Sequence, residues 1–302
     1  MSVFTDIDRL LRHSPLARAQ PFIRARTPWL HRALIVSRDA VLPFKTKHGL
    51  DRYQHRAVER FYSFSPDLSG AVLEIGSDLK GGVLKELAGR DVRNAIGLNI
   101  AVNPSAHSER GSGGVPDYEI VQGDARSLPF RSESISSILS ITAFEHVHDM
   151  GVALDEMYRV LRRGGLLYSE FGPIWSCSIG HHVEAMVDGV EARHEKPGKN
   201  PVPHFAHLLM RPSQLRAAVL RTPWVFPALA DAIVEWIYEG QALNRLFYED
   251  YIRLFDASPF RVRHLQPVRE HVPAALQAQL KTACPRYSHF DVRMVEVVLE
   301  KV

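Results

Sequence analysis

Short apolar runs alternate with amphipathic stretches along the middle of the chain. The apolar runs cover residues 71–75, 94–100, 118–122, 135–141 and 166–171. Runs of this length without helical periodicity are typical of strands that are buried on both faces. Helical patterns stand between them, beginning at Val83 and again at Leu154. Strands that alternate with helices predict a mostly parallel sheet.

The stretches before and after this alternation have other patterns. Residues 1–70 are mostly helical in character, with an amphipathic helix expected over 54–64. Residues 172–259 are rich in His, Trp, Tyr and Pro, and they carry helical patterns over 212–220 and about 228–255. This segment is too long for a simple crossover, so we expect a helical lid or substrate-binding insertion.

The alternation returns at the end of the chain and completes the predicted fold. Strand patterns cover 261–265 and 294–300, with a short helix over 274–283 between them. The sequence therefore predicts a doubly wound, mostly parallel seven-stranded α/β sheet. Residues 71–171 form its core and residues 260–302 supply its last strands.

Composition narrows the class of protein. The chain has 302 residues, a formal net charge of +3 and two cysteines, Cys177 and Cys284. Two cysteines are too few for a disulfide framework, and no apolar run has the length of a membrane span. The first sixteen residues lack the apolar centre of a secretory signal. We expect a cytoplasmic enzyme whose oligomeric state is left open.

The basic residues are concentrated near the start of the chain. Nine Arg and Lys residues between Arg9 and Lys47 face a single acidic residue, Asp39. A solvated helical face explains this pattern, and so does peripheral contact with an anionic partner such as a membrane surface or a phosphorylated glycan carrier. Aromatic stacking residues are sparse there, so a nucleic-acid partner is not expected.

A glycine turn follows the first predicted core strand. Gly76 has no Cβ, so a ligand can lie close over the strand end. The turn lacks the Gly-x-Gly-x-x-Gly spacing of dinucleotide enzymes. The acidic neighbours Glu74 and Asp78 are unfavourable for a pyrophosphate and suit a ligand with an ammonium and a sulfonium group.

Further polar residues follow the next strands at regular intervals. Asn99 ends the second strand, where it can hydrogen-bond ribose hydroxyls. Asp124 follows the third strand, where a carboxylate can accept a hydrogen bond from an adenine amino group. The fourth strand leads into residues 142–147. In a doubly wound sheet these carboxyl ends border one crevice, where ligands bind.

At these positions the chain resembles a known family. Residues 70–172 are similar to the type-11 group of class I S-adenosylmethionine (SAM)-dependent methyltransferases. The matching motifs are Leu73-Glu74-Ile75-Gly76-Ser77, Gly123-Asp124-Ala125, Leu128-Pro129-Phe130, Phe144-Glu145-His146-Val147 and the stretch from Glu156 to Gly165.

The resemblance implies a Rossmann-like methyltransferase fold and SAM as the cofactor. It assigns the methionine part of SAM to the turn, the ribose to the end of the second strand and adenine to the Gly123-Asp124-Ala125 motif. The expected cofactor-binding residues are Glu74, Gly76, Ser77, Asn99, Ile100, Asp124, Ala125, Thr142 and Glu145. Asp78 and Lys80 depart from the family, which commonly has glycines there, and Asn99 stands where an acid is common.

Candidate substrate-side residues follow the fifth strand. His181 and His182 are the preferred general bases, because an imidazole titrates near neutral pH, and His146 is an alternative. Trp175 and Tyr248 are candidates for substrate contact, although core packing explains them equally well. Histidines are plentiful in this insertion, but none has a metal-binding spacing on a helix, so no metal is predicted.

No motif in the sequence identifies the molecule that accepts the methyl group. An insertion of this size favours an enclosed small molecule or glycan, and we expect O-methylation. C- or N-methylation of a quinone-like or lipid acceptor is an alternative. A non-catalytic interaction module with the same fold is another, supported by the departures at Asp78, Lys80 and Asn99. A nicotinamide-dependent oxidoreductase is disfavoured by the absent glycine fingerprint.

Overall fold

The structure, a computed structural model, describes residues 45–90, 92–101, 108–109 and 118–302. The chain forms two compact units, residues 1–55 and residues 56–302, and only the second is considered below. The helical pattern of 1–44 and most of the basic stretch lie outside the described residues. The expected anionic partner of that stretch therefore stays a prediction.

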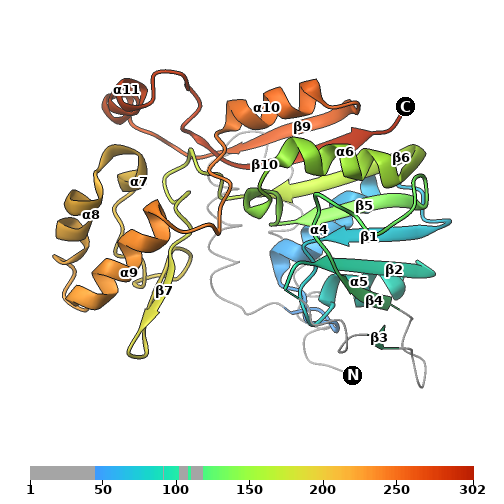
Figure 1. Ribbon diagram of the computed structural model, residues 1–302, viewed down its shortest axis with the longest axis horizontal. Coiled ribbons are helices and arrows are strands. Elements are labelled where there is room, and N and C mark those ends of the chain that lie inside the picture. Colours follow the sequence, from blue (N-terminus) through green and yellow to red (C-terminus); the bar gives the residue numbers. More distant parts are fainter. Residues whose placement is uncertain (1–44, 91, 102–107, 110–117) are drawn as a thin grey trace, which may run out of the picture. The chain divides into compact units, whose positions relative to one another are not determined.

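An eight-stranded sheet is the centre of the second unit (Figure 1). Its strand order is β3-β4-β2-β1-β5-β6-β10-β9. Strands β4, β2, β1, β5 and β6 are parallel, and β10 lies antiparallel between β6 and β9. The strands are β1 Ala71–Ile75, β2 Asn94–Asn99, β3 Ser108–Glu109, β4 Tyr118–Gln122, β5 Ile135–Ile141, β6 Leu161–Phe171, β9 Arg261–Arg269 and β10 Val292–Glu300. The predicted seven-stranded sheet is confirmed, and β3 adds a two-residue edge strand.

Helices cover both faces of this sheet, as a doubly wound fold requires. Strands β1 and β5 are buried along their whole length, which explains their continuous apolar runs. Leu167 of β6 belongs to the main hydrophobic cluster, together with residues of α6 (Met150–Val160) and α10 (Tyr248–Ala257). The next residue, Tyr168, points to the opposite face, because side chains alternate along a strand.

On that opposite face Tyr168 meets Phe61 of α4 (Arg52–Ser63), with ring centroids 6.1 Å apart. Arg60 of α4 also forms an ion pair with Glu296 of β10, at 2.5 Å. Helix α5 (Gly82–Ala88) follows the glycine turn after β1 and packs beside β2. The two helical layers thus leave the carboxyl ends of the parallel strands accessible.

The start of β6 differs from the prediction. The sequence indicates a helix stop at residues 163–165 and a strand from Leu166, but helix α6 ends at Val160 and β6 begins at once with Leu161. Of the added residues, Leu161 pairs with Ile135 of β5, and after a register shift the pairing resumes at Leu166. A Cβ on Gly165 would lie 2.7 Å from the Ser136 carbonyl oxygen, so this glycine permits close strand contact rather than ending the helix.

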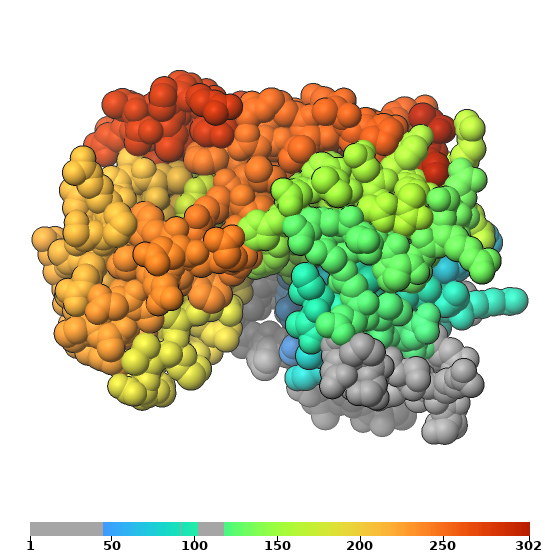
Figure 2. All heavy atoms as spheres, in the orientation of Figure 1, coloured from blue at the N-terminus to red at the C-terminus, as the bar shows by residue number. Residues whose placement is uncertain are grey.

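The insertion after β6 contains a β-hairpin that the sequence analysis missed. Strands β7 (Glu184–Val187) and β8 (Val190–Arg193) pair antiparallel and pack with the helices that follow. Those helices are α7 Ala206–Leu209, α8 Pro212–Val219 and α9 Pro227–Tyr238. They share a hydrophobic cluster of their own, and Figure 2 shows the yellow and orange atoms of this part on one side of the green sheet region.

The predicted helix over 228–255 is two helices. A loop over residues 239–247 separates α9 from α10, and the two helices pack in different places. Tyr251 and Phe255 of α10 are buried in the main cluster of the sheet, whereas Ile233 of α9 is buried in the cluster of the insertion. Helix α10 therefore belongs to the sheet layer, and the insertion proper ends before it.

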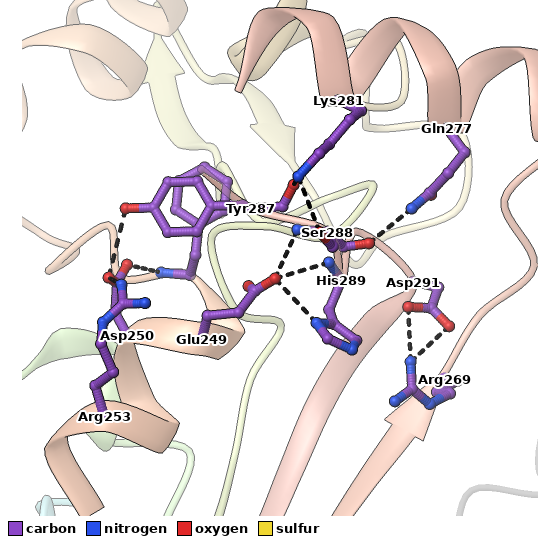
Figure 3. Close-up of polar contacts among 11 residues, drawn as sticks. Glu249, Asp250, Arg253, Arg269, Gln277, Lys281, Tyr287, Ser288, His289 and Asp291 are labelled. Atoms are coloured by element: carbon purple, nitrogen blue, oxygen red, sulfur yellow. Dashed lines mark hydrogen bonds and ion pairs between the residues drawn. The ribbon is translucent and has the colours of Figure 1, made fainter. Parts of the chain in front are cut away.

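A carboxylate on α10 holds the chain that leads into β10 (Figure 3). The Oε1 atom of Glu249 accepts hydrogen bonds from the backbone N–H groups of Ser288 and His289, at 2.6 and 3.0 Å. The ring of Tyr287 stacks on Phe247 with centroids 3.8 Å apart. These contacts fix the segment between α11 (Ala274–Ala283) and β10 against α10.

Candidate active site

A cavity of about 260 Å³ lies at the carboxyl ends of β1, β2, β4 and β5. This is the crevice in which doubly wound sheets bind ligands. It brings together seven of the residues predicted from the sequence: Gly76, Asn99, Ile100, Asp124, Ala125, Thr142 and His146. Its wall also contains residues that the sequence analysis did not identify, among them Leu98, Arg126 and His148.

Gly76 is the first residue of the turn after β1. Its φ of +81° lies in the left-handed region, and a Cβ there would lie 2.4 Å from the Cβ of Ala143. The N–H groups of Gly76 and Ser77 both donate to the carbonyl of Leu98, at 2.9 and 3.1 Å. The end of β2 thus holds the turn in place, and only glycine fits at its tightest point.

Asn99 holds the same turn from the end of β2. Its Nδ2 donates to the carbonyl of Ser77 at 2.6 Å, and its Oδ1 accepts from the N–H of Ala101 at 2.8 Å. A carboxylate at this position has no hydrogen to donate to the Ser77 carbonyl. This contact gives a structural reason for the departure from the acidic residue that the family commonly has.

Asp124 is paired with Arg126 on the cavity wall. The Nε and Nη2 atoms of Arg126 donate to Asp124, with Nη2 2.7 Å from Oδ2. Nη1 of the same guanidinium donates to Asp149 at 2.9 Å. Arg126 holds the pKa of Asp124 below its usual value. The carboxylate expected to contact adenine is therefore already engaged.

Two buried carboxyl groups lie behind the cavity wall rather than on it. Glu74 is 4% exposed and Glu145 is 2% exposed, and burial raises the pKa of each to about 8. The Oε1 atom of Glu145 accepts from the N–H of Gly172 at 3.0 Å. Within the described part of the chain, the Oε2 atoms of both residues are buried without a hydrogen-bond partner. Ser77, also expected at the cofactor, is fully buried.

Thr142 ends β5 in a strained conformation. Its φ is +50°, a left-handed value that β-branched residues rarely adopt. Its N–H donates to the carbonyl of Glu170 at 2.9 Å, which ties the turn to β6. Backbone strain of this kind costs about 1–3 kcal/mol and is concentrated at functional sites. The strained turn directs the segment 143–148 along the cavity.

Among the three candidate bases, His146 is the one on the cavity wall. Its Nδ1 lies 2.7 Å from the carbonyl of Ala242. A carbonyl only accepts, so Nδ1 carries the hydrogen and Nε2 of the neutral ring is a hydrogen-bond acceptor. The protein packed around the ring lowers the pKa of His146, which keeps Nε2 unprotonated near neutral pH.

His181 and His182 do not line the cavity, although the sequence analysis expected their loop to face it. The ring of His182 packs edge-on against that of His146, with centroids 5.4 Å apart. His181 and His182 are both buried, and His182 donates through Nε2 to the carbonyl of Pro173. Its ring stacks on His194 with centroids 4.7 Å apart. Burial lowers the pKa of His182 to about 3 and that of His181 well below its ordinary value. Both rings are neutral packing groups in this structure.

Asn244 joins the loop between α9 and α10 to the cavity wall. Its Nδ2 donates to the carbonyls of Phe144 and Val147, at 2.7 and 2.9 Å. Its N–H donates to the carbonyl of Glu145 at 3.0 Å, and its Oδ1 accepts from the hydroxyl of Tyr251 at 3.0 Å. These bonds fix the short 3-10 helix η1 (Phe144–His146), which carries the candidate base.

The two candidate substrate residues have packing partners in this structure. Trp175 is half-buried, and its ring lies against His207 and under the guanidinium of Arg245. Tyr248 is 8% exposed and belongs to the main cluster. Neither lines the cavity. Over the described residues, no group of three or more His, Cys, Asp or Glu side chains is arranged to hold a metal ion.

The comparison with known protein families agrees with this geometry. Residues 73–169 match the family model described as a methyltransferase domain. This part of the chain is similar to a methyltransferase domain. The resemblance stated from the sequence is confirmed, and SAM is the cofactor of this family.

Relatives that match this part of the chain are named as methyltransferases. One is 24-methylenesterol C-methyltransferase 2 of Oryza sativa subsp. japonica, 29% identical over 42% of this chain and 36% of the relative. Another is the probable phthiotriol/phenolphthiotriol dimycocerosates methyltransferase 2 of Mycobacterium ulcerans (strain Agy99), 35% identical over 37% of this chain and 43% of the relative. The chain thus spans less than half the length of these relatives.

A solved structure also resembles the chain. It is geranyl diphosphate C-methyltransferase from Streptomyces coelicolor A3(2), with 11% identity, a TM-score of 0.45, and coverage of 82% of this chain and 79% of that one.

The methyltransferase domain can accommodate the cofactor of its family. SAM carries an ammonium and a sulfonium group, and Glu74 holds an unpartnered carboxyl oxygen directly before the turn. Gly76 lines the cavity, and the absence of a Cβ lets Ala143 pack closely against it. A buried carboxyl group with a raised pKa ionises when a cation binds beside it, which favours cationic ligands.

Proposed function

We propose that the chain is a SAM-dependent methyltransferase that acts on a small-molecule acceptor. The observation that supports this most directly is the cavity at four strand ends, which is lined by Gly76, Asn99 and Asp124. The cofactor, when bound, supplies an electrophilic methyl group. The residues of this chain hold it, position the acceptor and remove a proton.

Each part of the cofactor has a proposed contact. Glu74, Gly76 and Ser77 would hold the methionine part, with Thr142 and Glu145 behind the reacting end. Asn99 and Ile100 would border the ribose, and Asp124 and Ala125 the adenine. Asn99 keeps hydrogen-bonding capacity on Oδ1, because a carbonyl oxygen has two lone pairs and Ala101 uses one.

His146 is the proposed proton acceptor, in preference to His181 and His182. It lines the cavity, and its hydrogen bond to Ala242 leaves Nε2 as the acceptor. A hydroxyl acceptor needs such a base, because a neutral hydroxyl is a poor nucleophile. This arrangement therefore favours O-methylation of a small molecule.

A lipid-like acceptor is the second candidate. Two relatives are named as methyltransferases of a sterol and of 2-phytyl-1,4-naphtoquinone, and a third is named a fatty-acid O-methyltransferase. Over the described residues, no helix is long and apolar enough to cross a membrane. A glycan acceptor has no corresponding support among these names.

Cofactor binding is tested first, by calorimetry with S-adenosylhomocysteine (SAH) and SAM. We expect binding in the micromolar range to the wild type and a loss of tenfold or more in Asp124→Ala, since a hydrogen bond to a charged group contributes about 1.5–3 kcal/mol. Absence of binding to folded wild-type protein would favour the non-catalytic interaction module instead.

The acceptor class is tested with methyl-labelled SAM and a panel of fatty acids, quinols and glycosides. Transfer to one class identifies it. His146→Gln should then reduce turnover about 100-fold while SAH affinity stays within twofold, because general-base catalysis contributes about 10²–10⁴-fold. Unchanged turnover in this variant would exclude His146 as the base.

A further inference from the structure

Arg126 lies where it can control access to the adenine end of the cavity. We propose that Arg126 competes with the adenine amino group for the carboxylate of Asp124, and that Asp149 favours binding by drawing the guanidinium away. This proposal rests on the proposed function, because it assigns the adenine of SAM to Asp124. It makes Arg126 a residue that sets cofactor affinity.

The carboxylate of Asp124 has little hydrogen-bonding capacity left. Its Oδ1 accepts from the backbone N–H of Arg126 at 2.9 Å and from Nε at 3.1 Å. Its Oδ2 accepts from Nε at 3.0 Å and from Nη2 at 2.7 Å. A carboxylate has about four lone-pair sites, so an adenine amino group has to share or displace one of these contacts.

The guanidinium also weakens Asp124 as an acceptor. An ionised carboxylate forms stronger hydrogen bonds than a neutral group, but an arginine paired to it offsets much of its charge. Arg126 is part of the cavity wall, so this compensating charge lies beside the proposed adenine position. Removing it should strengthen the bond between Asp124 and the amino group.

Asp149 bonds to the same guanidinium from another side. It is the residue before helix α6, and its Oδ2 lies 2.9 Å from Nη1 of Arg126. Both ends of the contact are solvent-exposed, with 40% of the Arg126 side chain and 68% of the Asp149 side chain accessible. The guanidinium bonds to both carboxylates at once, and exposed ion pairs contribute little to stability, so Arg126 can keep Asp149 and release Asp124 when adenine binds.

The backbone makes Asp149 a suitable site for a neutral substitution. Its φ is +48°, a left-handed value that Asn tolerates as well as Asp does. Asp149→Asn therefore removes the charge that attracts Arg126 without straining the start of α6. In this variant the guanidinium is left with Asp124 as its one carboxylate partner.

The experiment is SAH calorimetry on three variants. Arg126→Ala should bind SAH about threefold to tenfold more tightly than the wild type, because a competing exposed ion pair is removed. Asp149→Asn should bind about twofold to fivefold more weakly. The double variant should match Arg126→Ala, because Asp149 acts only through Arg126. Arg216→Ala removes an equally exposed ion pair, with Asp231 in the insertion, and should leave SAH affinity unchanged.

A ligand without the amino group separates competition from a general charge effect. S-inosylhomocysteine carries a carbonyl oxygen in place of the adenine amino group, so it should gain nothing from Arg126→Ala. Equal or weaker SAH binding in Arg126→Ala, with the wild type binding normally, would overturn this inference and leave the proposed function intact. Wild-type protein that does not bind SAH would overturn both.

Discussion

The cavity wall and the histidine cluster after β6 both bury ionisable groups, but they do so differently. Near the cavity, Glu74 and Glu145 have pKa values of about 8 and an unpartnered oxygen each within the described part of the chain. In the histidine cluster, His182 and His207 have pKa values of about 3 and 4, and each ring contacts a main-chain carbonyl.

An unpartnered buried atom does not by itself indicate a site. His207 bonds a carbonyl through Nε2, but within the described part of the chain its Nδ1 is also buried without a hydrogen-bond partner. A buried carboxyl group beside a cavity, with an oxygen left over, costs stability unless a ligand uses it. The histidine-rich loop was the more conspicuous feature of the sequence, yet His181 and His182 do not line the cavity.

The sharpest test of this comparison is the glycine turn. Gly76→Ala should lower the free energy of unfolding by about 2–5 kcal/mol, from left-handed strain and the clash with Ala143 together. SAH binding should be abolished. Gly189→Ala is the matched control, because Gly189 also has a positive φ of 78° but nothing within 4 Å of its missing Cβ.

The control variant should lose only about 1 kcal/mol and bind SAH normally. Urea denaturation and calorimetry measure both quantities. Equal losses in the two variants would show that backbone strain, and not the close approach at the cavity, makes Gly76 necessary.

A substitution at Asn244 tests whether the loop after α9 supports the cavity wall. Asn244→Ala removes its bonds to Phe144 and Val147, and we expect a loss of about 2–4 kcal/mol in stability. SAH affinity should fall as well, since η1 forms part of the wall. Asn200→Ala, in the insertion, should cost less than about 1 kcal/mol and leave affinity unchanged. Unaltered SAH binding in Asn244→Ala would separate the loop from the site.

A substitution at Glu249 tests a polar network outside the cavity. Glu249→Ala removes the acceptor for Ser288 and His289 (Figure 3) and should lower stability by about 1–2 kcal/mol. Thermal unfolding measures this loss. SAH affinity should stay within twofold, since Glu249 does not line the cavity. Weaker SAH binding would contradict a purely structural role.

The pH dependence of stability should distinguish the two regions. Glu74 and Glu145 have ordinary pKa values of 4.5 and folded values of about 8. Between these values the unfolded chain ionises and the folded chain does not, so their contribution to stability is lost as pH rises through about 8. The histidines behave oppositely: their contribution is present above pH 6.5 and is lost as pH falls towards 3–4.

Glu145→Gln separates these effects, because Gln keeps an oxygen for Gly172 and does not titrate. Between pH 6.5 and 8 the variant should lose less stability than the wild type, by up to about 1.4 kcal/mol per pH unit for one proton. The stability of the variant should still decline below pH 6.5, because the histidines are unchanged. Parallel alkaline slopes in the two proteins would show that Glu145 is ionised in the folded state.

Local patterns predicted much of the fold. The bounds of β1, β4, β5 and α11 agree with the apolar and helical patterns, because each element carries its own signal in consecutive residues. Long-range contacts explain where the prediction failed. Pairing with β5 extends β6 back to Leu161, and the hairpin β7–β8 consists of short, half-exposed strands with weak alternation.

The sequence by itself determined the sheet, the family and the residues at the strand ends. Parallel strands that are buried on both faces appear in the sequence as continuous apolar runs. The topology of the sheet then places Gly76, Asn99 and Asp124 at one edge of it. The tertiary structure alone decided which side chains face the cavity. Arg126 is held by Asp149, and the hydrogen bond of Asn244 to Phe144 joins residues that are 100 positions apart. Such contacts depend on how distant segments pack, and no local pattern of residues encodes them.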